Sequence, residues 1–299
     1  MPLTPAAHEF YAAPAPMTEL PWASAGDRLA DLPSDAAGAA DVTRGVLVHR
    51  DWAPGLGLQF DASRLADQHL RPMTAVVERV LEISPMNLVS PRDLPDRMVG
   101  VCRHFTTLHV ALLRNAGVPA RARVGFARYF GDGWVDHWIT EWWDGDRWVR
   151  TDAQVGPLAR QLLRLSFDPA DQPHGEFLTA GEAWQRVRTG EEDANHFGIF
   201  DLRGMWFVAG SLTLDLGALN KVELLPWDIW GDIGFGPGVE PSPEQLARAD
   251  ALAALLLDDD LDALRVRFAQ PDVAVPATIT TIIDGVPTQV GIAPDLLAV

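Results

Sequence analysis

The stretch spanning residues 99–154 constrains this chain more than any other, because it contains the only cysteine of the 299-residue sequence. Cys102 is followed along the chain by His137 and then by Asp152. These three residue types can form a thiol nucleophile, the base that deprotonates it and the carboxylate that orients the base. The stretch therefore predicts nucleophilic thiol chemistry, with these three residues as the catalytic candidates and no metal required.

The residues around Cys102 predict a helix over residues 101–115. Strong helix formers fill residues 101–115, Gly100 stands just before them, and Gly117 followed by Pro119 is a stop signal. Cys102 is therefore expected in the first turn. Unpaired backbone N–H groups and the positive end of the helix dipole favour a thiolate at that position.

The sequence also predicts how His137 and Asp152 meet. Two strand-like runs, residues 136–143 and 146–152, flank Asp144-Gly145, a dipeptide typical of a two-residue hairpin turn. With those two residues as the loop, His137 lies directly opposite Asp152 on the paired strand. Opposed side chains of an antiparallel pair project to the same face, so the carboxylate is expected to hold one imidazole nitrogen and leave the other for Cys102.

Three blocks of this stretch resemble the transglutaminase-like superfamily: GVCRHF with its helix ending LRNAGVPAR, then DHWITEWWDGDRWV, and TD at the end. The resemblance implies a papain-like fold and matches the family's Cys, His and Asp blocks to Cys102, His137 and Asp152. Trp138 stands where a small residue often follows the family histidine, and His104 stands where an acidic residue is common. Members include cross-linking transferases, proteases, amidases, amide-forming enzymes and inactive copies, so the resemblance constrains the chemistry more than the substrate.

These observations predict an α+β fold, in which a central catalytic helix packs on an antiparallel sheet of a papain-like, transglutaminase-like core. We expect a partly irregular N-terminal arm at 1–40, the catalytic domain with an aromatic-rich extension at 41–240, and an appendage of one helix and one hairpin at 241–299. Outside the catalytic stretch, local signals predict helices at residues 74–83, 179–189 and 243–257. A hairpin is predicted around Asp284-Gly285.

The charge, the apolar runs and the cysteine count of the chain limit its expected partners and cellular location. A formal charge of −17 argues against nucleic acid and against an anionic membrane surface as partners. No apolar run approaches the length of a membrane span, the N-terminus lacks the features of a signal peptide, and one cysteine cannot form an internal disulfide. We therefore expect cytoplasmic residence; the oligomeric state stays open.

Among the remaining residues, Trp138 and His196 are candidates for a substrate pocket, the first because it adjoins His137 and the second because it lies in an aromatic segment. His109 lies two helical turns beyond Cys102, too far for the thiol, and is expected to be a hydrogen-bonded core histidine. Neither paired cysteines nor an HExxH motif occurs, so we expect no metal and no cofactor.

Two functions are compatible with this sequence. The first is cysteine-dependent acyl transfer on an amide, ester or thioester of a small-molecule or peptide substrate. Water as the acceptor makes it a hydrolase or amidase, and an amine makes it an amide-forming acyltransferase. The alternative is a non-catalytic binding or scaffold protein with a transglutaminase-like fold.

Overall fold

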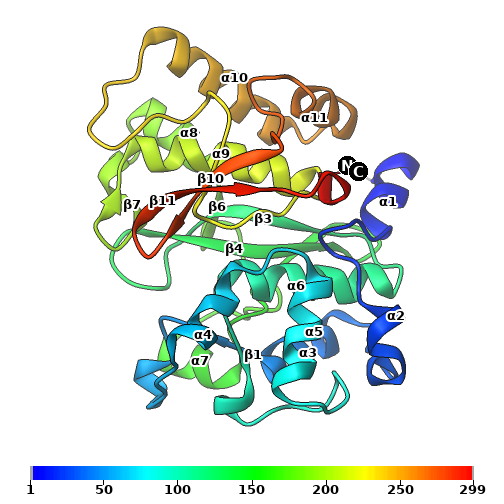
Figure 1. The fold of residues 1–299 in the computed structure, drawn as a ribbon. Helices are drawn as coiled ribbons and strands as arrows, with labels where there is room; N and C mark the ends of the chain where they lie inside the picture. Colours follow the sequence, from blue (N-terminus) through cyan, green and yellow to red (C-terminus); the bar gives the residue numbers. More distant parts are fainter. Residues whose placement is uncertain (1–2, 298–299) are drawn as a thin grey trace. The chain divides into compact units, whose positions relative to one another are not determined.

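The computed structural model describes residues 3–297 and mixes helices with sheet, in agreement with the predicted α+β class (Figure 1). The chain divides into two compact units. Unit 1 comprises the chain up to Ala122 together with Ile139–Gln172, and unit 2 comprises Arg123–Trp138 together with the chain from Pro173 onward. Strands β3 (Ala120–Ala127) and β4 (Trp134–Trp143) therefore each contribute residues to both units. The domain boundaries expected at residues 40 and 240 stay predictions.

Unit 1 is built around helix α6, whose residues are buried from its first residue up to Arg114. Contacts to α6 come from α1, α3 and α5, and α5 also packs on β2. Strands β1 and β2 pair in parallel, with His49 beside Gly100. Besides its parts of β3 and β4, unit 1 contains α1 (Pro5–Ala12), α2 (Trp22–Ala25), η1 (Gly26–Leu29), α3 (Ala36–Val46), β1 (Leu47–His49), η2 (Pro54–Leu56), α4 (Ala62–Leu65), η3 (Ala66–His69), α5 (Met73–Ile83), η4 (Leu94–Asp96), β2 (Met98–Gly100), α6 (Cys102–Asn115), β5 (Trp148–Thr151) and α7 (Pro157–Leu162).

Unit 2 has its own apolar core, in which α8, α9 and α10 pack against one another. The helices bury Trp184, Leu212 and Leu252 there, together with Phe126 of β3. Besides its parts of β3 and β4, unit 2 contains β6 (Phe177–Thr179), α8 (Ala180–Thr189), η5 (Ala194–His196), β7 (Phe197–Ile199), β8 (Leu202–Arg203), α9 (Met205–Leu219), β9 (Asp228–Ile229), α10 (Pro243–Asp258), α11 (Leu261–Phe268), β10 (Thr278–Ile283), β11 (Val286–Gly291) and η6 (Pro294–Leu297).

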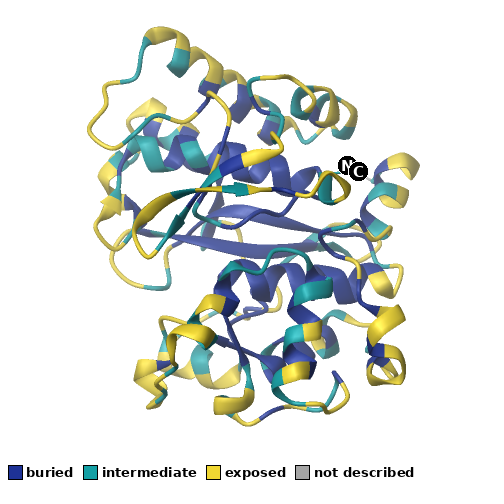
Figure 2. Cartoon of the chain, viewed as in Figure 1, coloured by how far each residue is buried: buried dark blue, intermediate teal, exposed yellow. Residues whose placement is uncertain are grey.

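The main sheet has the strand order β6-β3-β4-β7-β8, and β5 pairs with β4. β3 is buried along its whole length (Figure 2).

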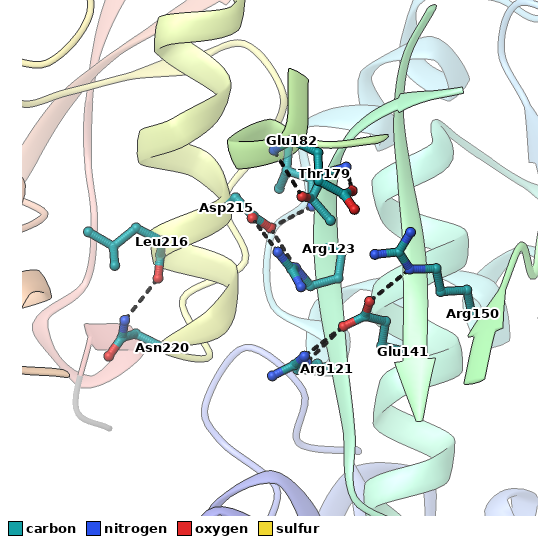
Figure 3. A network of polar contacts seen from close by, with 10 residues as sticks. Arg121, Arg123, Glu141, Arg150, Thr179, Glu182, Asp215, Leu216 and Asn220 are labelled. Atoms are coloured by element: carbon teal, nitrogen blue, oxygen red, sulfur yellow. Dashed lines mark hydrogen bonds and ion pairs between the residues drawn. The ribbon is translucent and has the colours of Figure 1, made fainter. Parts of the chain in front are cut away.

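Two buried ion pairs involve β3, one within each unit (Figure 3). In unit 1 Arg121 Nε donates to Glu141 Oε2 at 2.9 Å, and Arg150 Nε donates to Glu141 Oε1 at 3.1 Å. In unit 2 Arg123 donates hydrogen bonds to both carboxylate oxygens of Asp215, from Nε at 3.1 Å and from Nη2 at 2.9 Å.

Several predicted elements are confirmed. The predicted helices correspond to α5, α8 and α10. Two of these helices begin with a capping box, formed by Thr179 with Glu182 in α8 and by Ser242 with Gln245 in α10. The C-terminal hairpin also forms as predicted, with Ile283 opposite Val286 around Asp284-Gly285. Within residues 3–297, no helix combines the length and the apolarity that a membrane crossing requires.

The register predicted for β4 and β5 is wrong. The structure pairs Trp143 with Trp148 and Thr140 with Thr151, so the loop contains four residues instead of two. A two-residue type I′ turn needs positive φ at both loop positions, and here only Gly145 has it, at 107°. The Asp144 carboxylate instead accepts the backbone N–H groups of Asp146 and Arg147, both at 2.8 Å, and these bonds hold the wider loop.

Candidate functional site

Cys102 is the first residue of α6, so it lies in the first turn as predicted, and 8% of its surface is exposed. It follows β2 directly, with Val101 as the extended residue between strand and helix. The N-terminal N–H groups of a helix have no partner within the helix, and they favour negative charge nearby. Cys102 therefore occupies the position where a thiolate is best stabilised by the backbone.

His104 completes the start of this helix. The backbone N–H of Val101 donates to its Nδ1 at 3.2 Å, and its Nε2 lies 3.0 Å from the carbonyl oxygen of Leu70. Because a carbonyl only accepts, Nε2 carries the proton and the ring is neutral. Burial is the main cause that lowers the pKa of His104 to about 3. His104 thus acts as the capping side chain that a glutamate usually provides three residues into a helix.

Further along α6, His109 is a hydrogen-bonded core residue, as expected. Its ring nitrogens lie 3.0 Å from Thr140 Oγ1 and 3.0 Å from the carbonyl oxygen of Ala36. Burial is the main cause that lowers its pKa to about 4. Both ring nitrogens are therefore occupied by structural contacts within unit 1.

Asp152 lies immediately after β5 in unit 1 and is 1% exposed. Its backbone N–H donates to the carbonyl oxygen of Pro169 at 2.8 Å, which draws the chain away from the β4 ladder. Its Oδ1 accepts the backbone N–H of Gln154 at 2.9 Å. This local turn holds Asp152 by two hydrogen bonds that the predicted hairpin did not include, one to its backbone and one to its carboxylate.

His137 lies in β4 within unit 2, and it is 2% exposed. Two aromatic rings from the preceding loop contact it: the centroid of Phe130 at 4.7 Å with planes 65° apart, and that of Tyr129 at 6.2 Å with planes 80° apart. Sequence reasoning missed both residues. The only signal was the aromatic pair itself, placed just before the loop Gly131-Asp132-Gly133.

The two neighbours of His137 in β4 are also buried. Asp136 is 8% exposed, and burial is the main cause that raises its pKa to about 7, with an opposing contribution from His137. Trp138 is 1% exposed, and its Nε1 has no hydrogen-bond partner among the described residues. Successive side chains of a strand point to opposite faces, so adjacency alone does not bring Trp138 to the ring of His137.

His196, the second pocket candidate, lies in η5 of unit 2 with 59% of its side chain exposed. Its Nδ1 is 3.5 Å from Glu192 Oε2, and its carbonyl oxygen accepts Arg203 Nη1 at 3.0 Å. Its place in a substrate pocket stays a prediction, as does that of Trp138.

Within unit 1, a pocket of about 480 Å³ is lined mainly by residues 53–65, together with Arg50. The backbone N–H of Arg50 donates to the carbonyl oxygen of Gly100 at 2.9 Å, two residues before Cys102. The pocket is therefore anchored to the strand that leads into α6. Among residues 3–297, no cluster of three or more His, Cys, Asp or Glu side chains is arranged to hold a metal ion.

Cys102 and Asp152 thus belong to unit 1 and His137 to unit 2. Their assembly into one triad stays a prediction.

No curated protein and no solved structure matches the chain. The family model of the transglutaminase-like superfamily does match it, over residues 82–153, a range that includes all three predicted catalytic residues. The chain therefore contains a transglutaminase-like region, and residues 82–153 are that region.

Proposed function

We propose that this protein is a thiol enzyme that transfers acyl groups through Cys102, with His137 as the base and Asp152 as the residue that orients the base. The observation that carries the proposal is the position of Cys102 as the first residue of α6 inside the transglutaminase-like region. A cysteine at that position gains thiolate stabilisation that a cysteine within a helix lacks.

In the proposed reaction, His137 takes the proton of the Cys102 thiol, and the thiolate attacks the carbonyl carbon of an amide, ester or thioester. Asp152 fixes the imidazole tautomer and stabilises the imidazolium. The backbone N–H of Cys102 stabilises the oxyanion of the tetrahedral intermediate. The imidazolium returns its proton to the departing amine, alcohol or thiol, which leaves an acyl-thioester on Cys102. Attack by water then gives an acid, and attack by an amine gives an amide.

The proposed substrate is a small molecule or a peptide. We include Trp138 and His196 as candidate residues of the substrate pocket. The alternative function is a binding or scaffold protein in which Cys102 is an ordinary buried thiol.

The test is the pH dependence of alkylation by iodoacetamide, followed by intact mass. Cys102 is the only cysteine, so the variant Cys102→Ala reports any reaction at other groups. An activated thiol is expected to react well below the ordinary thiol pKa of about 8.5. A rate that follows a single titration near that value would support the scaffold alternative and reject the enzyme.

A second variant tests the orienting carboxylate. Asp152→Asn keeps the volume of the side chain but removes its charge, so we expect it to fold and to lose most of the low-pH alkylation. Wild-type alkylation kinetics in this variant would remove Asp152 from the mechanism, whatever the result for Cys102.

A further inference from the structure

The ring of His137 is packed edge to face against an aromatic side chain that the proposed mechanism does not use. Phe130 lies with its centroid 4.7 Å from that of the imidazole, and Tyr129 packs on Phe130 at 4.5 Å. All three residues belong to unit 2, and Phe130 and Tyr129 are only partly buried. We infer that Phe130 is a positioning residue for His137, an inference that rests on the proposed function.

The loop that carries Phe130 is anchored at both ends. At its start the backbone N–H of Arg128 donates to the carbonyl oxygen of Glu176 at 3.1 Å. At its end Gly133 has a φ of 81°, and a Cβ at that position would lie 2.6 Å from the carbonyl oxygen of His196. Glycine is therefore required there by conformation and by close approach. These anchors restrict where the ring of Phe130 can lie.

The physical consequence concerns the directions of the two imidazole nitrogens. A histidine that serves as a base must keep one nitrogen toward the nucleophile and the other toward its orienting group. Rotation of the imidazole about its Cβ–Cγ bond would move its edge relative to the ring of Phe130. An aromatic neighbour at edge-to-face distance thus favours one ring orientation, whereas a flexible aliphatic side chain would not.

The variant that tests this inference is Phe130→Leu, measured by the iodoacetamide pH profile of Cys102 and by thermal unfolding. With the imidazole less well oriented, the thiolate loses part of its stabilisation. We expect the alkylation rate near pH 6 to fall about tenfold and the profile to move toward that of a free thiol. The melting temperature should change far less than the profile. A leucine variant with the wild-type profile would overturn the inference.

Two controls and one replacement variant make the result decisive. Phe130→Tyr keeps the ring and should restore the wild-type profile. Phe200→Leu, an equivalent substitution at a phenylalanine of unit 2 that is 68% exposed, should leave the profile unchanged. If Phe130→Leu does not fold, Phe130→Met takes its place, since methionine adapts to irregular gaps.

The outcomes also separate this inference from the proposed function. If Cys102 of the wild-type protein shows no reactivity at low pH, both the activated thiol and the role of Phe130 are rejected. Low-pH reactivity in the wild type that is unchanged in Phe130→Leu and Phe130→Met rejects the positioning role alone.

Discussion

His104 shows how one side chain serves the start of the helix that carries Cys102. Its Nδ1 accepts the backbone N–H of Val101 at 3.2 Å, and its burial keeps the ring neutral. In the sequence, His104 stands out only as a departure from the acidic residue that is common at this position in the transglutaminase-like superfamily. The structure explains the departure, because a neutral imidazole supplies the same acceptor as a capping glutamate or glutamine.

A pH-dependent stability follows from His104. Its pKa is lowered to about 3 in the folded state, whereas an unfolded histidine titrates near 6.5. The unfolded state therefore binds the additional proton first, and stability is lost as the pH falls below about 6.5. His104→Gln keeps the acceptor without the titration. By urea unfolding, the free energy of unfolding of the variant relative to the wild type should rise by about 3 kcal/mol as the pH falls from 7.5 to 4.5. A constant difference would contradict this assignment.

The stability contribution of Asp136 has the opposite pH dependence to that of His104. Burial raises its pKa to about 7 from 3.8, so the folded state retains a proton that the unfolded state releases. Its contribution to stability is present below pH 3.8 and is lost as the pH rises to about 7.

Asp136→Asn should therefore stabilise the protein at about pH 8, on the order of 1–3 kcal/mol, and the gain should vanish near pH 4. Urea unfolding at both pH values measures it. Asp132→Asn, at an exposed residue of the neighbouring loop, is the matched control, because it makes the same substitution without burial. A gain that is equal at both pH values would argue against a buried, titrating Asp136.

At the scale of elements, two Asp-Gly hairpins of the same chain show where sequence patterns succeed and fail. Asp284 and Gly285 have φ of 50° and 78°, and the two-residue turn forms as predicted. At Asp144-Gly145 the same dipeptide gives a four-residue loop, because the aspartate carboxylate captures the backbone instead. Which competing hydrogen bond forms depends on the neighbouring chain: Arg147 also pairs with Asp171, at 2.6 Å.

The β7–β8 hairpin contains backbone strain that a substitution can release. Phe200 is the first of its two turn residues, has a φ of 51° and is 68% exposed. Left-handed backbone costs a non-glycine residue about 1 kcal/mol, and an exposed ring recovers little of it through packing. Phe200→Gly should raise the free energy of unfolding by about 0.5–1 kcal/mol, measured by urea denaturation. Phe200→Leu, which keeps the strain, should not, and equal values for the two variants would reject the strain.

For the whole molecule, features that depend on residues close together in the sequence could be predicted, whereas features that depend on contacts between distant segments could not. Cys102 at the start of α6 and the capping boxes were predictable, because each depends on residues within one turn. The packing of Phe130 on His137 was not, since it depends on the path of the loop between β3 and β4. The turn that anchors Asp152 was also missed, because it uses the carbonyl oxygen of Pro169, seventeen residues away in sequence.

The buried pair Arg123–Asp215 tests whether the two units unfold together. Asp215 is fully buried, and besides the arginine it accepts the backbone N–H of Val124 at 2.9 Å. Removing its charge leaves Arg123 with a poorer buried partner, so Asp215→Asn should cost about 3 kcal/mol. Asp171→Asn, which weakens an exposed pair, should cost at most about 1 kcal/mol.

Hydrogen exchange then shows how the destabilisation is distributed. β3 and β4 each supply residues to both units, so disordering them in unit 2 also disorders strand residues of unit 1. We therefore expect Asp215→Asn to lower amide protection in α6 of unit 1 as well as in α9 of unit 2, in one cooperative transition. Loss of protection confined to unit 2 would instead mean that the transglutaminase-like residues of unit 1 can remain folded while unit 2 opens.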